Sequence, residues 1–175
     1  TSITDSDGIT IKHFLDSIVP IFTFNIEEGS KIIDVGTGAG FPGMPIKIVR
    51  EDLKFTFMDS LNKRITFLNC VIEKLELKNI RTVHARAEDS GRSELRDNFD
   101  ICVARAVANL PVLCELCLPH VRPGGVFVAM KGNVDEELVM AKSIFERKKY
   151  NLDRKVEFKL PKEGSTRTIL KIKCN

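Results

Sequence analysis

The sequence has 175 residues, of which 43% are hydrophobic and 29% are charged, and its net charge is +3. This length and composition predict one globular domain over residues 1–175, with a hydrophobic core of its own. No apolar run reaches the roughly 20 residues that span a bilayer, and the five cysteines are scattered. We therefore expect reduced thiols, a cytoplasmic location and no membrane partner.

The elements alternate between strands and helices along most of the chain. Short apolar runs predict strands over 31–35, 54–59, 80–85, 99–105 and 122–132. Apolar residues at helical spacing predict helices over 9–22, from Pro45 onward, and over 62–77, 109–121 and 134–147. The first of these helices belongs to an N-terminal segment, 1–28, that precedes the sheet.

Two late extended stretches, 156–160 and 168–173, predict an added antiparallel hairpin. Strands that alternate with helices form a parallel sheet with helices on both faces. The fold class we expect is therefore α/β and Rossmann-like, with a mostly parallel seven-stranded sheet that includes an antiparallel C-terminal strand.

The stretch "KIIDVGTGAGFPGMP" (31–45) places a glycine turn directly after the first strand. Glycines at 36, 38 and 40 permit positive φ and let a ligand approach the backbone closely. A dinucleotide site has the pattern G-x-G-x-x-G, and here Phe41 stands where its third glycine would be. The pattern disfavours a diphosphate and favours a nucleoside, although a tight connection alone would also explain the glycines.

The ends of the next two strands carry groups that a nucleoside needs. Asp59 ends the second strand, where a carboxylate can accept both ribose hydroxyls. Ala87 and Glu88 follow the third strand, where a backbone amide and a carboxylate can read an adenine edge. Because parallel strands end at one crevice, we expect these groups to share a ligand.

Longer motifs carry a resemblance to a known family. "KHFLDS" (12–17), "DVGTGAGFPGMP", "MDSLNKRITFL", "HARAED" and "VARAVANL" together resemble the RsmG (GidB) family of S-adenosylmethionine-dependent guanine-N7 methyltransferases. The resemblance covers essentially the whole chain, without the further N-terminal helices of the family. It implies a methyltransferase fold, S-adenosylmethionine as cofactor, and 16S ribosomal RNA or the small ribosomal subunit as partner; we expect a monomer.

The residues and the resemblance together predict a cofactor site. It comprises Gly36, Gly38, Phe41, Asp59, Ala87, Glu88 and Arg105. Asp34 is expected to face the methionine amino group of the cofactor. Arg105 reaches the site from the end of the fourth strand, to hold cofactor or RNA, although an arginine paired at a sheet end is the alternative.

The expected reaction needs no general base, nucleophile or metal, because guanine N7 has a free lone pair and loses no proton. Orientation alone can supply about 7–11 kcal/mol. Arg105 is the only candidate for a catalytic residue. Phosphate contacts are expected from a set of cations near the crevice, each of which a solvated surface position would also explain: Lys63, Arg64, Lys131 and Arg167.

Three other functions stay open. A methyltransferase of the same fold can act on a small molecule or a protein, since fold does not fix substrate. An NAD-dependent oxidoreductase is disfavoured by Phe41, and a non-enzymatic binding module by the three strand ends. The C-x-x-C of Cys114 and Cys117 lies in an apolar helix without a second pair, which favours buried thiols over a zinc site.

Overall fold

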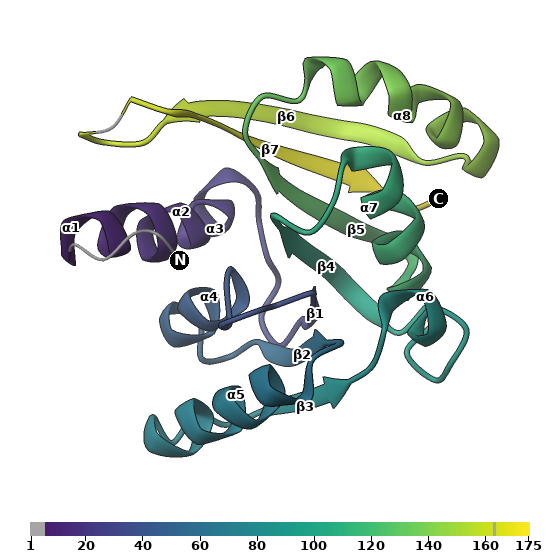
Figure 1. The fold of residues 1–175 in the computed structure, drawn as a ribbon. Coiled ribbons are helices and arrows are strands. Elements are labelled where there is room, and N and C mark those ends of the chain that lie inside the picture. The colour runs from purple at the N-terminus through teal and green to yellow at the C-terminus, as the bar shows by residue number, and fades with distance from the viewer. Residues whose placement is uncertain (1–5, 163) are drawn as a thin grey trace.

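All seven strands join one twisted sheet (Figure 1). The computed structural model describes residues 6–162 and 164–175, so the start of the expected segment 1–28 lies outside the described residues. The strands are β1 (Lys31–Val35), β2 (Lys54–Asp59), β3 (Ile80–His84), β4 (Phe99–Arg105), β5 (Val121–Lys131), β6 (Asn151–Lys159) and β7 (Thr166–Lys173). Their spatial order is β3-β2-β1-β4-β5-β7-β6.

The pairing confirms the expected fold class. Neighbours from β3 to β5 pair in parallel, whereas β7 is antiparallel to both β5 and β6. The chain therefore forms a β6–β7 hairpin that inserts its second strand beside β5. The strands predicted over 31–35, 54–59 and 99–105 have the observed bounds, and the late strands begin earlier than expected.

Helices cover both faces of the sheet. They are α1 (Ser6–Ile9), the π-helix η1 (Thr10–Leu15), α2 (Asp16–Ile18), α3 (Pro20–Thr23), α4 (Gly43–Val49), α5 (Asn62–Lys74), α6 (Ala87–Ser90), α7 (Leu110–Cys117), the 3₁₀ helix η2 (Leu118–His120) and α8 (Asp135–Lys148). No helix among residues 6–162 and 164–175 is long and apolar enough to cross a bilayer.

Three helix expectations are corrected by the structure. The single helix expected over 9–22 is divided into short segments, with a break at Val19 before Pro20, whose ring carries no N–H to continue the hydrogen bonding. The helix after the glycine turn starts at Gly43 rather than Pro45. The four-residue helix α6 was not expected, because so short a segment shows no period.

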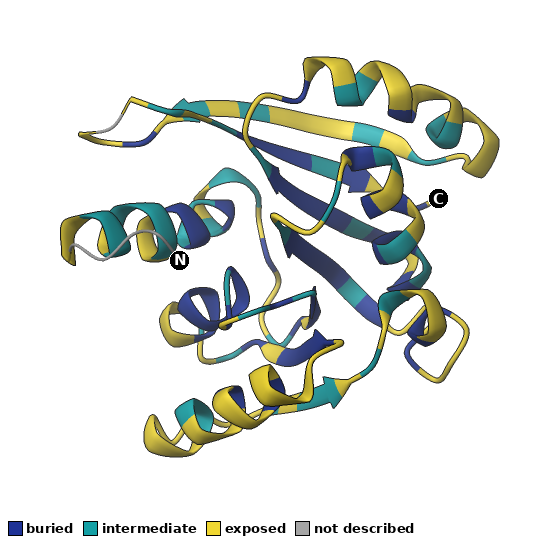
Figure 2. Cartoon of the chain, in the orientation of Figure 1, coloured by how far each residue is buried: buried dark blue, intermediate teal, exposed yellow. Residues whose placement is uncertain are grey.

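The core has two layers, one on each side of the sheet (Figure 2). Alternate residues of β1 divide between them: Ile32 packs toward α4 and α5, and Ile33 toward α7 and α8. Both are at most 1% exposed. Because the central strands are buried on both faces, side chains of their interior cannot reach a ligand, and the ends of the strands must form any site.

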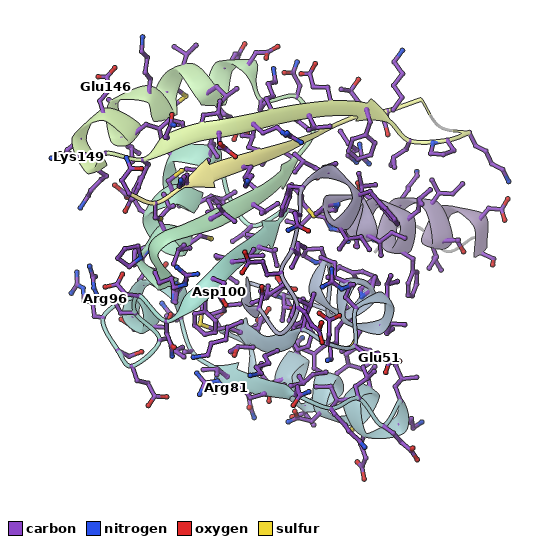
Figure 3. The ribbon with its side chains drawn as sticks, turned by 180° about the vertical axis from the view of Figure 1, so that it is seen from behind. Glu51, Arg81, Arg96, Asp100, Glu146 and Lys149 are labelled. Atoms are coloured by element: carbon purple, nitrogen blue, oxygen red, sulfur yellow. The ribbon has the colours of Figure 1, made fainter. Side chains whose placement is uncertain are left out.

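The two ends of the sheet differ. At the amino ends, Asp100 ties three strands together, since it accepts hydrogen bonds from the Lys31 amide (2.6 Å) and Arg122 Nε (2.6 Å). Figure 3 labels Asp100 on this side, away from the N-terminal helices. The arrowheads of β4 and β5 point toward the opposite side, where α1–α3 lie (Figure 1). That side contains the candidate site.

Candidate functional site

The carboxyl ends of β1, β2 and β3 surround a cavity of about 340 Å³, which we call the glycine-loop cavity. Its wall includes five of the residues that the sequence predicted: Gly36, Asp59, Arg64, Ala87 and Glu88. Gly38, Phe41 and Lys63 lie outside this wall. The structure therefore brings together one predicted group from each of three strand ends.

Gly36 begins the glycine loop and leaves room for the cavity. Its amide donates to the Met58 carbonyl of the neighbouring strand (2.9 Å), and its φ is +69°. A Cβ atom at this position would lie 2.8 Å from Val107 Cγ2, across the cavity wall. Any side chain here would be strained and would collide with Val107.

Asp34 holds both ends of the glycine loop by hydrogen bonds to its side chain. Its Oδ2 accepts hydrogen bonds from the Thr37 hydroxyl (2.8 Å) and the Gly43 amide (2.8 Å), at opposite ends of the loop. The side chain is fully buried, and Oδ1 has no partner among the described residues. Burial raises the pKa of Asp34 to about 7. Asp34 thus lies beneath the loop rather than in the cavity wall.

Asp59 connects the end of β2 to the loop. Its Oδ2 accepts from the Gly38 amide (2.9 Å), and its Oδ1 accepts from the Leu61 amide (2.9 Å). Arg64, in the first turn of α5, forms an ion pair with it (3.1 Å). Gly38 therefore acts on the cavity through Asp59, a wall residue whose carboxylate is held on three sides and is 1% exposed.

Helix α6 forms the far wall of the glycine-loop cavity, with Ala87 and Glu88 in its first turn. Ser90, in the same helix, lies 2.8 Å from Nε2 of His120, a fully buried histidine. Burial lowers the pKa of His120, which favours the neutral ring in this contact. The Ser90–His120 contact anchors α6 to η2.

A second cavity of about 350 Å³, the arginine cavity, adjoins the first. It lies where β4, β5 and β7 meet the N-terminal helices, and its wall includes Asp16, Arg105, Ala106, Lys131 and Arg167. Ala106 also lines the glycine-loop cavity. The two cavities therefore share a wall residue just beyond the end of β4.

Arg105 holds the N-terminal helices against the sheet. Its Nη1 contacts Asp16 Oδ2 (3.1 Å) and donates to the Lys12 carbonyl (3.1 Å). The guanidinium lies 5.3 Å from the ring centroid of Phe41, which also packs against His13. Phe41 thus contacts the N-terminal segment.

Two further cations share the arginine cavity. Arg167 Nε lies 3.5 Å from the same Asp16 oxygen that Arg105 contacts. Lys131 donates to the Ala108 carbonyl (2.8 Å) and pairs with Glu137 (2.9 Å). Together with Lys12 and Arg105 they make four positive side chains in the wall, and Asp16 is the one acidic residue among the described wall residues.

Asp16, Ala106 and Val107 were missed by the sequence reasoning. Asp16 falls in "KHFLDS" and Ala106 directly follows Arg105, so both were adjacent to recognised signals. Ala106 has a positive φ of 55°. This backbone conformation is uncommon for alanine, so the residue type gives no indication of it in the sequence.

The C-x-x-C residues are core thiols. Cys114 and Cys117 are at most 1% exposed in α7, and burial raises the pKa of Cys114 to about 12. Within residues 6–162 and 164–175, no group of three or more His, Cys, Asp or Glu side chains is arranged to hold a metal ion. Thiols of this kind are unreactive packing groups.

Both the sequence and the fold are similar to those of known proteins. The family model described as "rRNA small subunit methyltransferase G" (GidB) matches residues 1–167. The ribosomal RNA small subunit methyltransferase G of Lachnoclostridium phytofermentans is 50% identical over 175 residues, which cover 99% of this chain and 72% of that protein. The protein of the same name from Acetivibrio thermocellus is 51% identical over 176 residues, with the same coverage.

Solved structures share the fold. A SAM-dependent methyltransferase from Aquifex aeolicus superposes with a TM-score of 0.67 at 22% identity, over 96% of this chain and 93% of that one. M. jannaschii TYW2 in complex with AdoMet gives a TM-score of 0.73 at 16% identity, over 99% of this chain and 79% of that one. At these identities the similarity concerns the fold alone.

Proposed function

Because the chain belongs to the rRNA small subunit methyltransferase G family, we propose that it transfers a methyl group from S-adenosylmethionine to N7 of a guanine in 16S ribosomal RNA. The observation that carries the proposal is the junction of two unlike cavities at Ala106. One has the groups that a nucleoside needs and the other has the charge that RNA needs. A methyl donor and its acceptor must meet at such a junction.

The glycine-loop cavity fits the cofactor. Gly36 leaves space that a Cβ atom would fill, and Asp59 presents a carboxylate for the two ribose hydroxyls. Ala87 and Glu88 would bracket the adenine. S-adenosylmethionine supplies, when bound, a methyl group on a positively charged sulfur. Gly38 supports this site by way of Asp59, whereas Phe41 packs against Arg105, which lines the arginine cavity and not this one.

The residues of the arginine cavity would hold the RNA. Guanine N7 carries a lone pair and no proton, so the chain needs to orient the base and not to deprotonate it. Such orientation is worth about 7–11 kcal/mol. Lys131 would contact a phosphate there, Arg167 would contact a phosphate or the base itself, and Lys63 and Arg64 would contact phosphates beside the other cavity.

The acceptor in this proposal is 16S ribosomal RNA, free or in the small subunit. We further propose that the chain acts as a single-domain monomer in the cytoplasm. No residue acts as acid or base, and among the charged side chains of the arginine cavity Arg105 is the one whose loss should affect transfer most.

The test is a labelled-methyl assay with 16S ribosomal RNA and with small subunits, followed by mapping of the modified nucleotide. We expect 7-methylguanine at one position. A label found only in a protein or a small molecule would refute the RNA assignment and leave the cofactor assignment intact. Preferential binding of NADH over S-adenosylmethionine in a fluorescence titration would refute both.

Arg105→Ala tests the role of the arginine in the same assay. We expect kcat/KM for RNA to fall at least tenfold. The Arg105 side chain lines the arginine cavity, and it also holds Asp16 of the N-terminal helices in the wall of that cavity. Arg122→Ala, which removes an arginine paired with Asp100 at the other end of the sheet, is the matched control. Methylation by Arg105→Ala at the wild-type rate would contradict the assignment.

A further inference from the structure

The acidic side chain in the arginine cavity has an unusual arrangement. Asp16 is 5% exposed, and both ion pairs that it forms, with Arg105 (3.1 Å) and Arg167 (3.5 Å), use its Oδ2 atom. Its other oxygen, Oδ1, lies outside both ion pairs. Asp16 therefore keeps acceptor capacity beside two fixed guanidinium groups.

A carboxylate beside an arginine is complementary, in its hydrogen-bond acceptors and donors, to one edge of one nucleobase. The Watson–Crick edge of guanine presents an acceptor, O6, followed by two donors, N1–H and the N2 amino group. A carboxylate accepts from the two donors, and an adjacent arginine donates to O6. The corresponding edge of adenine has a donor, N6, next to an acceptor, N1, which a carboxylate would repel.

The same orientation leaves the reacting atom accessible. N7 lies on the opposite side of the purine from N1 and N2, so a base held by its Watson–Crick edge presents N7 away from Asp16. Ala106 borders both cavities, so N7 of such a base would receive its methyl group near this residue. Met130, Phe158 and Ile169 supply apolar wall for the faces of the ring.

On the basis of the proposed function, we infer that Asp16, with Arg167 beside it, reads the Watson–Crick edge of the acceptor guanine and selects guanine over other purines. Arg105, which is 14% exposed as a side chain against 26% for Arg167, fixes the carboxylate. Arg167 is the more accessible donor for O6. Asp16 is thus a specificity residue as well as an anchor of the N-terminal helices.

The first test changes the RNA and leaves the protein intact. Once the methylated nucleotide is mapped, RNA is prepared with inosine, which lacks the N2 amino group, at that position. We expect wild-type kcat/KM to be about 10- to 100-fold lower on inosine than on guanine, the range for one well-placed base contact. Equal kcat/KM on the two RNAs would overturn the inference while the proposed function stands.

The second test asks whether Asp16 is the reader. In Asp16→Asn the guanine-to-inosine ratio should fall to within about threefold, because the amide no longer accepts from both donors. Asp100→Asn is the matched control, since Asp100 also pairs with an arginine but lies at the amino ends of the strands (Figure 3). It should keep the wild-type ratio.

The ratio of kcat/KM on guanine RNA to kcat/KM on inosine RNA distinguishes a loss of base recognition from a loss of protein structure. Loosening of the N-terminal helices would lower kcat/KM on both RNAs and leave their ratio unchanged, and an unchanged ratio in a folded Asp16→Asn would overturn the inference. If Asp16→Asn does not fold, Asp16→Glu replaces it, which keeps the charge and moves the carboxylate. Its ratio should also fall. A wild-type protein that methylates no RNA would refute the proposed function and the inference together.

Discussion

The two adjoining cavities are built in different ways. The glycine-loop cavity depends on backbone atoms and short side chains at three consecutive strand ends, fixed by bonds such as Gly38 N–H to Asp59 (2.9 Å). The arginine cavity depends on long charged side chains from the N-terminal helices, β4, β5 and β7. The first is a property of the fold, whereas the second is a property of this sequence on that fold.

The largest effect is expected from filling the glycine-loop cavity. Gly36→Ala places a methyl group 2.8 Å from Val107 Cγ2 at a φ of +69°, so it combines a collision with backbone strain of about 1–3 kcal/mol. We expect the Kd for S-adenosylmethionine to rise at least 100-fold in calorimetric titration. Gly132→Ala, with nothing within 4 Å of its Cβ, is the control.

Partial rescue would sharpen this prediction. Adding Val107→Ala to Gly36→Ala removes the collision and keeps the strain, so part of the lost affinity should return. A Gly36→Ala protein that binds the cofactor as the wild type does would show that this cavity is not the cofactor site.

Removing the charge of Asp59 should have the next largest effect. Asp59→Asn weakens hydrogen bonds to a charged acceptor, each worth about 1.5–3 kcal/mol, so we expect the Kd for S-adenosylmethionine to rise about 10- to 100-fold. Asp52→Asn, whose carboxylate pairs with Arg50 far from the loop, is the matched control. Equal cofactor affinity in the two variants would contradict the ribose role of Asp59.

The buried acid beneath the loop predicts a pH effect on stability. The pKa of Asp34 is about 7 in the folded protein against 3.8 when unfolded, so the folded state holds the extra proton between these values. The contribution of Asp34 to the free energy of unfolding is therefore greatest below pH 4. It falls by up to about 4 kcal/mol as the pH rises through 7.

Asp34→Asn removes this titration. The free energy of unfolding of the wild type minus that of the variant should therefore fall as the pH is raised from 4 to 8, measured by urea denaturation. Asp100→Asn, which replaces an acid whose pKa is lowered, should give a difference that is nearly flat above pH 5, because this acid is ionised in both the folded and the unfolded state there. A flat difference for Asp34→Asn would contradict a raised pKa for this group.

The smallest effect is expected from single cations of the arginine cavity. Lys131→Ala should weaken RNA binding several-fold and reduce the slope of log K against log salt by about 0.7–0.9, the effect of one lost phosphate contact. Lys54→Ala, at the amino end of β2, should leave the slope unchanged. An unchanged slope in Lys131→Ala would place that lysine outside the RNA interface.

The sequence predicts the fold and the glycine-loop cavity well, for a physical reason. β1, β2 and β4 are buried apolar runs with sharp ends, and parallel strands deliver the residue after each end to one crevice. Gly36, Asp59 and Ala87 could therefore be grouped from their positions alone. The break at Val19 and the short helix α6 leave no comparable pattern.

The arginine cavity is harder to predict because its residues are brought together by long-range topology. Arg167 reaches Asp16 only because β7 inserts antiparallel between β5 and β6. The sequence suggested a terminal hairpin but not which strand would lie beside β5. Lys131 and Arg167 were therefore named as separate cations, and Asp16 was not named as the partner of Arg167.

The antiparallel insertion of β7 also sets an order of assembly during synthesis. Every wall residue of the glycine-loop cavity has left the ribosome once Leu116 has emerged, whereas the arginine cavity needs Ile169, near the other terminus. The last wall residue of the glycine-loop cavity is therefore synthesised some fifty residues before the last wall residue of the arginine cavity. Under the proposed function, the residues that would bind the methyl donor are thus synthesised before the last residues that would bind its acceptor.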